Sequence, residues 1–110
     1  MILYLDTSTE FCKMKLDEKE YVWHSGRDLA EGLLKFILEK LTENNKKIDD
    51  ITKIIFMRGP GSFMGLRIGA SVVNTLATEM NIPLFDHHGN RHKIILPEYG
   101  KPANITPPRK

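Results

Sequence analysis

The segment Arg58–Gly69, with the sequence RGPGSFMGLRIG, holds four of the eight glycines of the chain and follows the β-branched run DDITKIIFM. Glycines between a strand and a helix let the backbone approach another group closely, and a nucleotide phosphate is the first candidate for that group. A Walker-type phosphate loop needs a Lys and a Ser or Thr directly after its last glycine, but Leu66 and Arg67 follow Gly65. The sequence therefore argues against a Walker-type site.

A dinucleotide-binding fingerprint does not fit these glycines either. Gly59, Gly61 and Gly65 are spaced one residue too widely for it, and Pro60 lies inside the turn. The combination of glycine and proline predicts a rigid turn, and Ser62 after it can cap a helix. This segment is thus predicted to redirect the chain from a strand into a helix.

Gly65 and Gly69 lie four residues apart, on one face of that predicted helix. A helix face without side chains lets another backbone pack against it closely. That backbone belongs either to the sheet of this chain or to a partner protein, and the residues by themselves leave both interpretations open.

His87, His88 and His92 form a second candidate site. His88 and His92 have the i, i+4 spacing of metal ligands on a helix, which would suit a metal-dependent hydrolase. The Gly-Asn pair between them favours a turn, and only Asp86 supplies a carboxylate nearby. Histidines in a solvated loop are the alternative interpretation.

Two side chains are candidate nucleophiles. Cys12 lies among apolar neighbours of a predicted strand, which is typical of a buried small residue. Ser62 lacks the G-x-S-x-G spacing of a nucleophile elbow. Neither supports covalent catalysis, and a single cysteine allows no internal disulfide and fits a reducing compartment.

The elements that position these groups follow from hydrophobic periodicity. ILYLD predicts a buried strand, FCKMKLDEKEYVWH predicts a hairpin of two strands, and ITKIIFM and IPLF predict two further strands. Helices are predicted for residues 28–41 and for LRIGASVVNTLATEM, residues 66–80. The order β-β-β-α-β-α-β predicts an α/β fold with a mixed sheet, in which a meander adjoins parallel strands with right-handed crossovers.

The first predicted helix is apolar over an unusually wide arc. Asp28 and Glu31 form a plausible capping pair at its start. At about 100° per residue its apolar side chains span roughly 200°, about twice what packing on a sheet requires. These side chains are Leu29, Leu33, Leu34, Phe36, Ile37, Leu38 and Leu41. The surplus predicts a second contact surface, covered either by a partner protein or by the rest of the chain.

The character of the chain changes after residue 86. DHHGNRHK is polar and turn-like, IILPEYG can form one more strand, and KPANITPPRK has three prolines in ten residues. We therefore expect one lobe over residues 1–86, followed by a polar loop, a strand and an irregular, Pro-rich tail over residues 87–110.

The composition is that of an ordinary globular protein, with 41% hydrophobic and 27% charged residues. A net charge of +2 with scattered basic residues provides no electrostatic footprint for nucleic acid on this chain itself. The start MILYLD does not resemble a signal peptide, and no apolar run approaches the roughly 20 residues that span a bilayer. The expected location is the cytoplasm.

The glycine segment RGPGSFMGLRIG resembles the GPGSFTGLRIG signature of the bacterial TsaB family, also called YeaZ. MILYLDTSTEFC is similar to the opening strand, DTST turn and second strand of that family, AEGLLKFI to its first long helix, and NIPLF to its next strand. IILPEYGKPANITPPRK is similar to the tail that closes such proteins. The resemblance over residues 1–86 therefore predicts a shortened form, which joins one lobe to the tail without the usual second lobe.

The resemblance implies a fold, namely a single actin-like, sugar-kinase-like ATPase lobe of the ribonuclease H-like type. In active members of this fold, a loop after the first strand contacts nucleotide phosphate or metal, and Asp6, Thr7, Ser8 and Thr9 occupy that loop here. Because such ATPases close the nucleotide between two lobes, we expect a vestigial phosphate loop, no cofactor of its own and no catalysis by this chain.

The resemblance also implies a non-catalytic scaffold role in the complex that forms threonylcarbamoyladenosine beside the anticodon of tRNA. The expected partners are a TsaD-type catalytic subunit and a TsaE-type ATPase, which would hold ATP and a metal ion and leave tRNA in indirect contact with this chain. Self-association as a homodimer is the alternative. The predicted partner interface comprises Leu29, Leu33, Leu34, Ile37, Leu38, Leu41, Gly61, Ser62, Phe63, Met64, Gly65, Arg67, Ile68, Gly69 and Val72.

Two positions depart from the family pattern. Met64 stands where the family usually has Thr, and Leu29-Ala30 stands where it often has His-Ser. These changes remove hydroxyl and imidazole groups, so we do not expect the family's hydrogen bonds at these positions.

Overall fold

The structure is a computed structural model that describes residues 1–99, with eight regular elements and two short 3₁₀ turns. The predicted Pro-rich tail therefore lies outside the described residues from residue 100 onward. The strands and helices are β1 (Ile2–Asp6), β2 (Phe11–Leu16), β3 (Lys19–His24), α1 (Leu29–Glu43), β4 (Lys53–Phe56), α2 (Phe63–Met80), β5 (Leu84–Asp86) and β6 (Arg91–His92). The 3₁₀ turns are η1 (Gly26–Asp28) and η2 (Ile48–Asp50).

The strands form one six-stranded mixed sheet in the order β3-β2-β1-β4-β5-β6. β1 pairs with β4, and β4 with β5, in parallel, whereas β2, β3 and β6 are antiparallel to their neighbours. The predicted α/β fold, its mixed sheet and its order β-β-β-α-β-α-β are confirmed.

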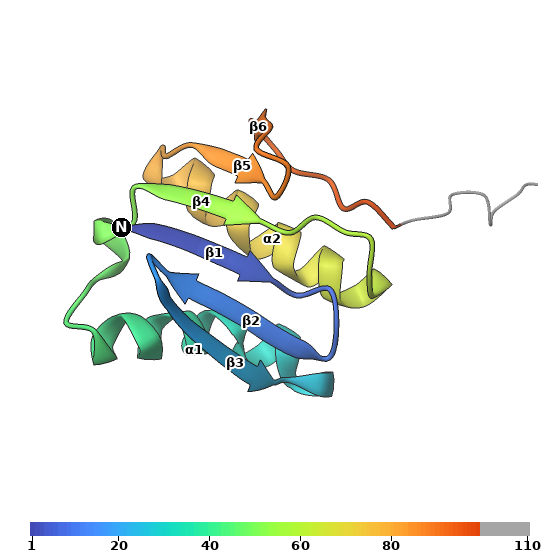
Figure 1. Cartoon of the computed structure of the whole chain (residues 1–110), viewed down its shortest axis with the longest axis horizontal. Coiled ribbons are helices and arrows are strands. Elements are labelled where there is room, and N and C mark those ends of the chain that lie inside the picture. The colour runs from blue at the N-terminus through green and yellow to red at the C-terminus, as the bar shows by residue number, and fades with distance from the viewer. Residues whose placement is uncertain (100–110) are drawn as a thin grey trace, which may run out of the picture.

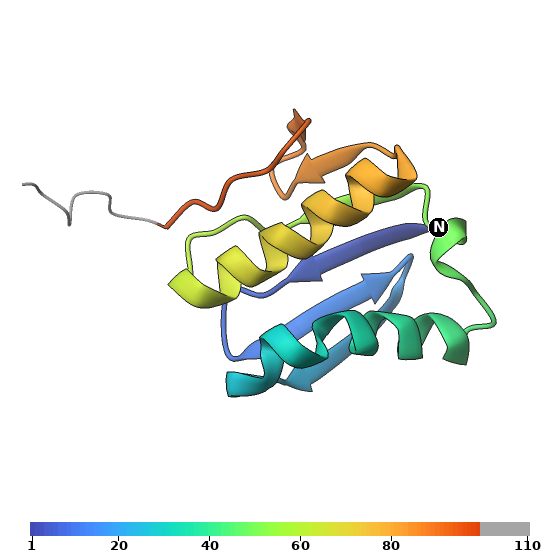
Figure 2. The same cartoon turned by 180° about the vertical axis from the view of Figure 1, so that it is seen from behind.

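Both helices cover the same face of the sheet. Figure 1 shows the sheet in front of α1 and α2, and Figure 2 shows the two helices in front of the sheet. Strand side chains alternate accordingly, so that Leu3 and Leu5 of β1 are fully buried under the helices while Ile2 and Tyr4 face the other way. The core lies between this single helical layer and the sheet.

Helix α1 extends from Leu29 to Glu43, slightly beyond the predicted end. Asp28 occupies its N-cap position but makes no side-chain capping hydrogen bond, so the predicted capping pair with Glu31 is wrong. The preceding turn η1 brings the chain into the helix with Asp28 already in near-helical backbone geometry, which leaves its carboxylate without the usual capping geometry.

Helix α2 begins where the glycine segment was predicted to start a helix. Ser62 Oγ accepts a hydrogen bond from the Gly65 amide at 3.1 Å, which confirms Ser62 as the capping residue. The helix ends at Asn81, whose left-handed backbone (φ 54°, ψ 50°) closes its last turn.

Ser62→Ala is expected to lower the free energy of unfolding by about 1 kcal/mol, because one amide of the first turn of α2 loses its acceptor. Urea unfolding followed by circular dichroism measures this loss. Ser71→Ala, at an exposed position within the same helix, is the matched control and should change stability by less than about 0.5 kcal/mol.

The chain after residue 86 differs from its prediction. A hairpin turn after β5 leads into β6, which adds a sixth strand within the segment predicted to be a polar loop. The strand predicted from IILPEYG is wrong, since residues 94–99 have no regular structure. Ile95 is nevertheless fully buried, and its backbone is bonded to Asn74 of α2, so this segment is fixed by side-chain hydrogen bonds in place of a strand partner. The division into domains at residue 86 stays a prediction.

Candidate functional site

The glycines of α2 accommodate the loop after β1 of this same chain. A Cβ atom at Gly65 would overlap the Thr7 carbonyl oxygen, and one at Gly69 would overlap the Thr7 hydroxyl and lie 2.7 Å from the ring of Phe56. Thr7 is fully buried and donates a hydrogen bond from Oγ1 to the Gly65 carbonyl at 2.6 Å. Of the two interpretations of the bare helix face, the close neighbour is therefore this chain's own sheet and loop.

The loop that the resemblance identified as a vestigial phosphate loop binds its own polar groups. Asp6 Oδ1 accepts hydrogen bonds from the Ser8 amide at 2.9 Å and from the Ser8 hydroxyl at 2.6 Å. The Ser8 carbonyl accepts from the Ser62 amide at 2.7 Å, and Thr9 bonds only to the backbone of Phe11. Thr7 and Ser8 thus join the loop after β1 to the start of α2, and Asp6 holds Ser8 in place.

The two candidate nucleophiles lie in structural positions. Cys12 is fully buried on the helix-covered face, where burial and then the nearby Asp6 raise the pKa of its thiol to about 12. A thiol with this pKa stays protonated at neutral pH, and the thiolate is the reactive form. Ser62 Oγ is engaged as the cap of α2.

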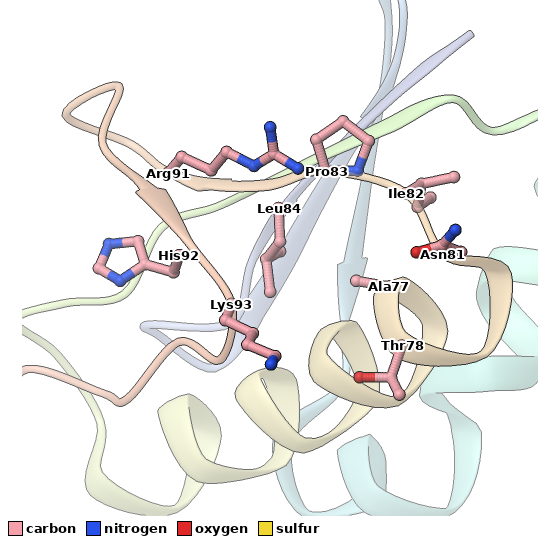
Figure 3. Close-up of a pocket in the computed structure, with 9 residues that line it drawn as sticks. All are labelled: Ala77, Thr78, Asn81, Ile82, Pro83, Leu84, Arg91, His92 and Lys93. Atoms are coloured by element: carbon pink, nitrogen blue, oxygen red, sulfur yellow. The ribbon is translucent and has the colours of Figure 1, made fainter.

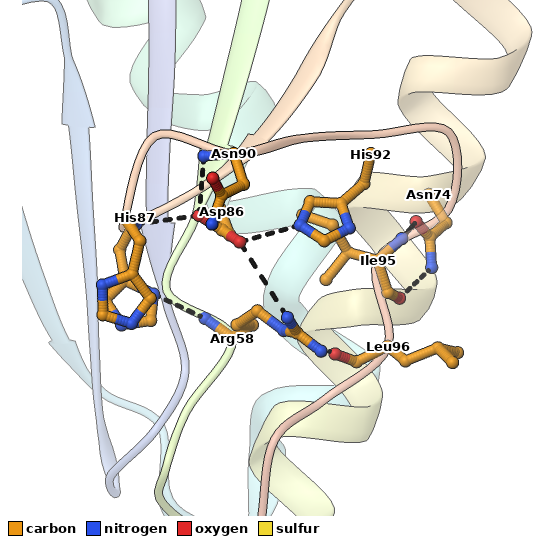
Figure 4. Close-up of polar contacts among 9 residues, drawn as sticks. Arg58, Asn74, Asp86, His87, Asn90, His92, Ile95 and Leu96 are labelled. Carbon is orange, nitrogen blue, oxygen red and sulfur yellow. Dashed lines mark hydrogen bonds and ion pairs between the residues drawn. The ribbon is translucent and has the colours of Figure 1, made fainter.

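The histidine segment forms a hydrogen-bonded cluster around the buried Asp86, which Figure 4 shows. Asp86 is 1% exposed and its carboxylate accepts from His92 at 2.7 Å and from the amides of His88 and Asn90 at 2.8 and 3.0 Å. Arg58 lies 3.9 Å from the same carboxylate. Desolvation alone would raise the pKa of Asp86, but these hydrogen bonds outweigh it and hold the pKa well below its ordinary value.

This cluster joins three segments and is not arranged as a metal site. Arg58, after β4, donates from Nε to the Leu96 carbonyl at 2.9 Å, and its amide points to His87 Nδ1 at 3.4 Å. His88 and His92 lie in a turn and a strand, so the predicted i, i+4 ligand pair does not form. Within residues 1–99, no three His, Cys, Asp or Glu side chains are grouped so that they could hold a metal ion.

A hollow of about 630 Å³ lies between the end of α2 and the β5–β6 hairpin (Figure 3). Lys93 points toward α2, whereas His92 points away from it toward Asp86. The other residues that line the hollow are Ala77, Thr78, Asn81, Ile82, Pro83, Leu84 and Arg91. Its polar side chains are exposed or half-buried, so they stay solvated and do not form a preorganised catalytic group.

The structure divides the predicted partner interface into a buried and an accessible part. Six of its residues are buried in this chain: Leu29, Leu33, Ile37, Leu41, Gly65 and Gly69. Ile68 and Val72 are half-buried. The exposed members are Leu34, Leu38, Gly61, Ser62, Phe63, Met64 and Arg67. One side of the wide apolar arc of α1 thus packs on the sheet, and the other side is exposed at Leu34 and Leu38.

The accessible apolar residues of α1 and α2, with Arg67, lie on the side of the helical layer away from the sheet, and we call them the helical surface. It comprises Leu34, Leu38, Met64, Arg67, Ile68 and Val72. Leu34 and Leu38 are 48% and 42% exposed and line a shallow depression along α1. Met64 is 58% exposed and lines two hollows between α1 and α2, of about 500 and 360 Å³. Large apolar side chains that stay exposed side by side mark an interaction surface more often than a catalytic one.

Phe63 has partners of its own beside this surface. Its ring lies 4.6 Å from that of Tyr99, and the Arg67 guanidinium lies 5.5 Å above it. These contacts hold Phe63 at the start of α2, so it is an edge of the helical surface and not a free anchor.

The two departures from the family pattern meet in the same place. Ala30 and Met64 line both of the hollows between α1 and α2, together with Ile68. Leu29 is only 4% exposed, although it also lines the larger of the two hollows. Ala30 and Met64, which stand where the family has Ser and Thr, therefore make the hollows that they share more apolar. The two residues are far apart in the sequence, so the sequence did not show that they meet.

No helix in the described part of the chain combines the length and the apolar character that a membrane crossing requires.

Comparison with known proteins places this geometry in a family. The family described as "TsaD: tRNA N6-adenosine threonylcarbamoyltransferase" matches residues 24–90. The chain is 34% identical over 87 residues to the tRNA threonylcarbamoyladenosine biosynthesis protein TsaB of Haemophilus influenzae, covering 76% of this chain and 37% of that protein. It is 31% identical over 93 residues to the TsaB of Escherichia coli, covering 76% and 38%.

A solved structure of YeaZ from Pseudomonas aeruginosa superposes with a TM-score of 0.69 and 32% identity, covering 77% of this chain and 42% of that one. The chain spans about two fifths of the length of these relatives. The actin-like, ribonuclease H-like lobe that the resemblance implied is confirmed by these matches and by the mixed sheet. The chain belongs to the TsaD family, and its relatives place it among the TsaB, or YeaZ, proteins of that family.

Proposed function

We propose that this chain takes part in tRNA threonylcarbamoyladenosine biosynthesis as a non-catalytic subunit, which binds a TsaD-type catalytic subunit through the helical surface. The names of its relatives supply the pathway. In this proposal the nucleotide, the metal ion and the transfer chemistry belong to the TsaD-type subunit and a TsaE-type ATPase, and tRNA contacts this chain only indirectly.

The observation that carries the proposal is the set of exposed apolar side chains Leu34 and Leu38 on α1 and Met64 on α2. Leu34 and Leu38 lie one turn apart on the outer side of α1, and Met64 and Ile68 follow the same spacing on α2. Two helices that present apolar residues at i and i+4 side by side suit packing against further helices. Apolar anchors with a charged residue such as Arg67 at the edge are typical of protein interfaces.

The loop after β1 supports the non-catalytic part of the proposal. Its hydroxyl groups and carboxylate are bonded within the chain, to Gly65, Ser8 and the backbone of Phe11. A phosphate that bound the Thr7 hydroxyl would have to displace its hydrogen bond to the Gly65 carbonyl, which joins this loop to α2. The junction is therefore better explained as a structural element that positions the helical surface.

Leu34→Glu is expected to weaken binding to the TsaD-type subunit of the same organism by about 30-fold or more, because a desolvated apolar anchor is replaced by a charge. Co-expression of the two proteins, followed by size-exclusion chromatography and isothermal titration, measures this loss. The variant itself should stay folded, since Leu34 is 48% exposed in the isolated chain.

Val22→Glu is the matched control, because Val22 is 57% exposed on the opposite side of the sheet. It should leave binding within about twofold of the parent chain. Equal weakening by both substitutions, or no complex with the parent chain, would contradict the proposal. A dimer of this chain alone that Leu34→Glu dissociates would instead assign the helical surface to a second copy.

A further inference from the structure

The sheet has a second face, opposite α1 and α2, that none of the described elements covers. Figure 1 shows this open face toward the viewer, with both helices behind it. Its side chains come from the alternate strand positions that point away from the core, such as Tyr4 of β1, Lys15 of β2 and Ile55 of β4. The open face is thus distinct from the helical surface and lies on the other side of the molecule.

The open face has two halves with different chemistry. The antiparallel strands β2 and β3 present Lys13, Lys15, Glu20 and Val22, all exposed. Antiparallel sheets commonly leave such a polar face in water. These strands therefore need no cover.

The parallel strands of the same face are apolar instead. Tyr4, Ile55 and Phe85 are register neighbours on β1, β4 and β5, and together they form a row across the sheet that we call the apolar row. All three are half-buried although no described element lies above them. Parallel strands are normally covered on both faces. Among residues 1–99, no element covers the apolar row as a second layer.

Two lysines border the apolar row. Lys53 Nζ lies 4.4 Å from the ring centroid of Phe85, and Lys15 Nζ lies 5.9 Å from that of Tyr4. The two carboxylates on this face lie opposite lysines in the strand register, Asp6 opposite Lys13 and Glu20 opposite Lys15. Lys53 and Arg91, on the same face as Ile55 and Phe85, add two further cations, so the net charge around the row is positive.

We propose that the apolar row is a docking site for an amphipathic α-helix of a partner protein, with an apolar stripe flanked by acidic side chains. An apolar stripe fills the row between Tyr4 and Phe85, and carboxylates on either side of it pair with Lys15 and Lys53. A helix on this face completes the layered arrangement that parallel strands require. Single-stranded RNA fits less well, because Lys15 and Lys53 of the chain already lie over the rings of Tyr4 and Phe85, on which bases would have to stack.

The test uses two fluorescein-labelled helical peptides of about 18 residues, long enough for roughly five turns. The acidic probe carries a leucine stripe flanked by Glu, and the basic probe carries the same stripe flanked by Lys. Fluorescence anisotropy at low salt should show saturable binding of the acidic probe and at least tenfold weaker binding of the basic probe. The double variant Lys15→Glu, Lys53→Glu should reverse this preference.

Ile55→Lys should weaken binding of the acidic probe at least tenfold, whereas Val22→Lys, on the polar half of the same face, should change it less than twofold. Circular dichroism shows whether each variant is folded, and the double variant Lys15→Glu, Lys53→Glu keeps the test valid if Ile55→Lys does not fold. Leu34→Glu should leave probe binding unchanged, so this result is separate from that for the helical surface.

The proposal is overturned by equal binding of both probes, by no saturable binding of the acidic probe, or by binding that Ile55→Lys does not affect. A dimer of the chain that Ile55→Lys dissociates would assign the row to a second copy. A 12-nucleotide oligouridylate that binds and displaces the acidic probe would assign it to RNA, and either result rejects a helical partner.

Discussion

Gly69→Ala is expected to lower the free energy of unfolding by about 2 kcal/mol, although alanine is the better helix former. At an open site inside a helix this substitution stabilises by up to about 1 kcal/mol. At Gly69 the new methyl group overlaps the Thr7 hydroxyl and lies 2.7 and 3.0 Å from two atoms of the Phe56 ring. The sign of the change therefore reports whether β1 and α2 pack as closely as the structure shows.

Thermal and urea unfolding measure this effect, and a loss of about 2 kcal/mol corresponds to roughly 8 to 16 °C in melting temperature for a chain of this size. Ser71→Ala, two residues further along α2 and exposed, is the matched control and should be neutral or slightly stabilising. A stabilising effect of Gly69→Ala would show that the contact with Thr7 and Phe56 is looser than this geometry.

The close packing of Gly69 against Thr7 and Phe56 also decides what the variant Gly69→Leu can test. If Gly69 faced a partner helix, leucine there would break a complex and leave the monomer folded. Because Gly69 is buried against Thr7 and Phe56, leucine is expected to prevent stable folding of the chain itself. Leu34→Glu is therefore the appropriate variant for testing the partner interface.

Local sequence signals correctly predicted the features that depend on residues close together in the sequence. The Ser62 cap and the order of strands and helices along the chain depend on short spacings, and the structure confirms both. The partner of the bare face of α2 could not be predicted in this way. Thr7 is 58 residues from Gly65 along the chain, and only the pairing of β1 with β4 brings them together.

Helix α1 gives a second example of what local sequence signals cannot predict. Its periodicity predicted more apolar surface than one sheet can bury, and Leu34 and Leu38 are indeed left exposed. Periodicity alone does not tell which edge of a wide arc faces the sheet, because that depends on how the helix is rotated about its axis. Leu33 and Leu34 are adjacent in sequence, yet the first is fully buried and the second is 48% exposed.

The Asp86 cluster was missed because its sequence is typical of a solvated loop. DHHGNRH combines turn-forming and polar residues, and the prediction treated its histidines as ligands or loop residues. The available signal was the aspartate at the end of an apolar strand, four residues before an Asn that follows Gly. Such an aspartate can accept from the amides of the turn after it, as Asp86 does from His88 and Asn90.

Asp86→Ala is expected to lower the free energy of unfolding by about 2 to 3 kcal/mol at pH 7, because the amides of His88 and Asn90 and the His92 ring lose a charged acceptor inside the protein. The hairpin that carries β6 should separate first, which hydrogen exchange at residues 88–92 would detect. Asp86→Asn keeps an oxygen for the two amides and should cost less. Asp49→Asn, at an exposed carboxylate, is the control and should change stability by less than about 0.5 kcal/mol.

Asn has nearly the same shape as Asp but no charge. The pH dependence of stability, compared with that of Asp86→Asn, therefore shows how much of the contribution of Asp86 comes from its charge. The pKa of Asp86 is depressed in the folded chain, so its contribution is complete above the ordinary carboxyl pKa of about 3.9 and is lost as the pH falls from there toward the folded value. Unfolding free energies measured from pH 7 down to pH 3 should therefore fall more steeply below about pH 4 in the parent chain than in Asp86→Asn. Parallel curves for the two proteins would show that Asp86 is not the carboxylate whose ionisation His92 and the turn amides stabilise.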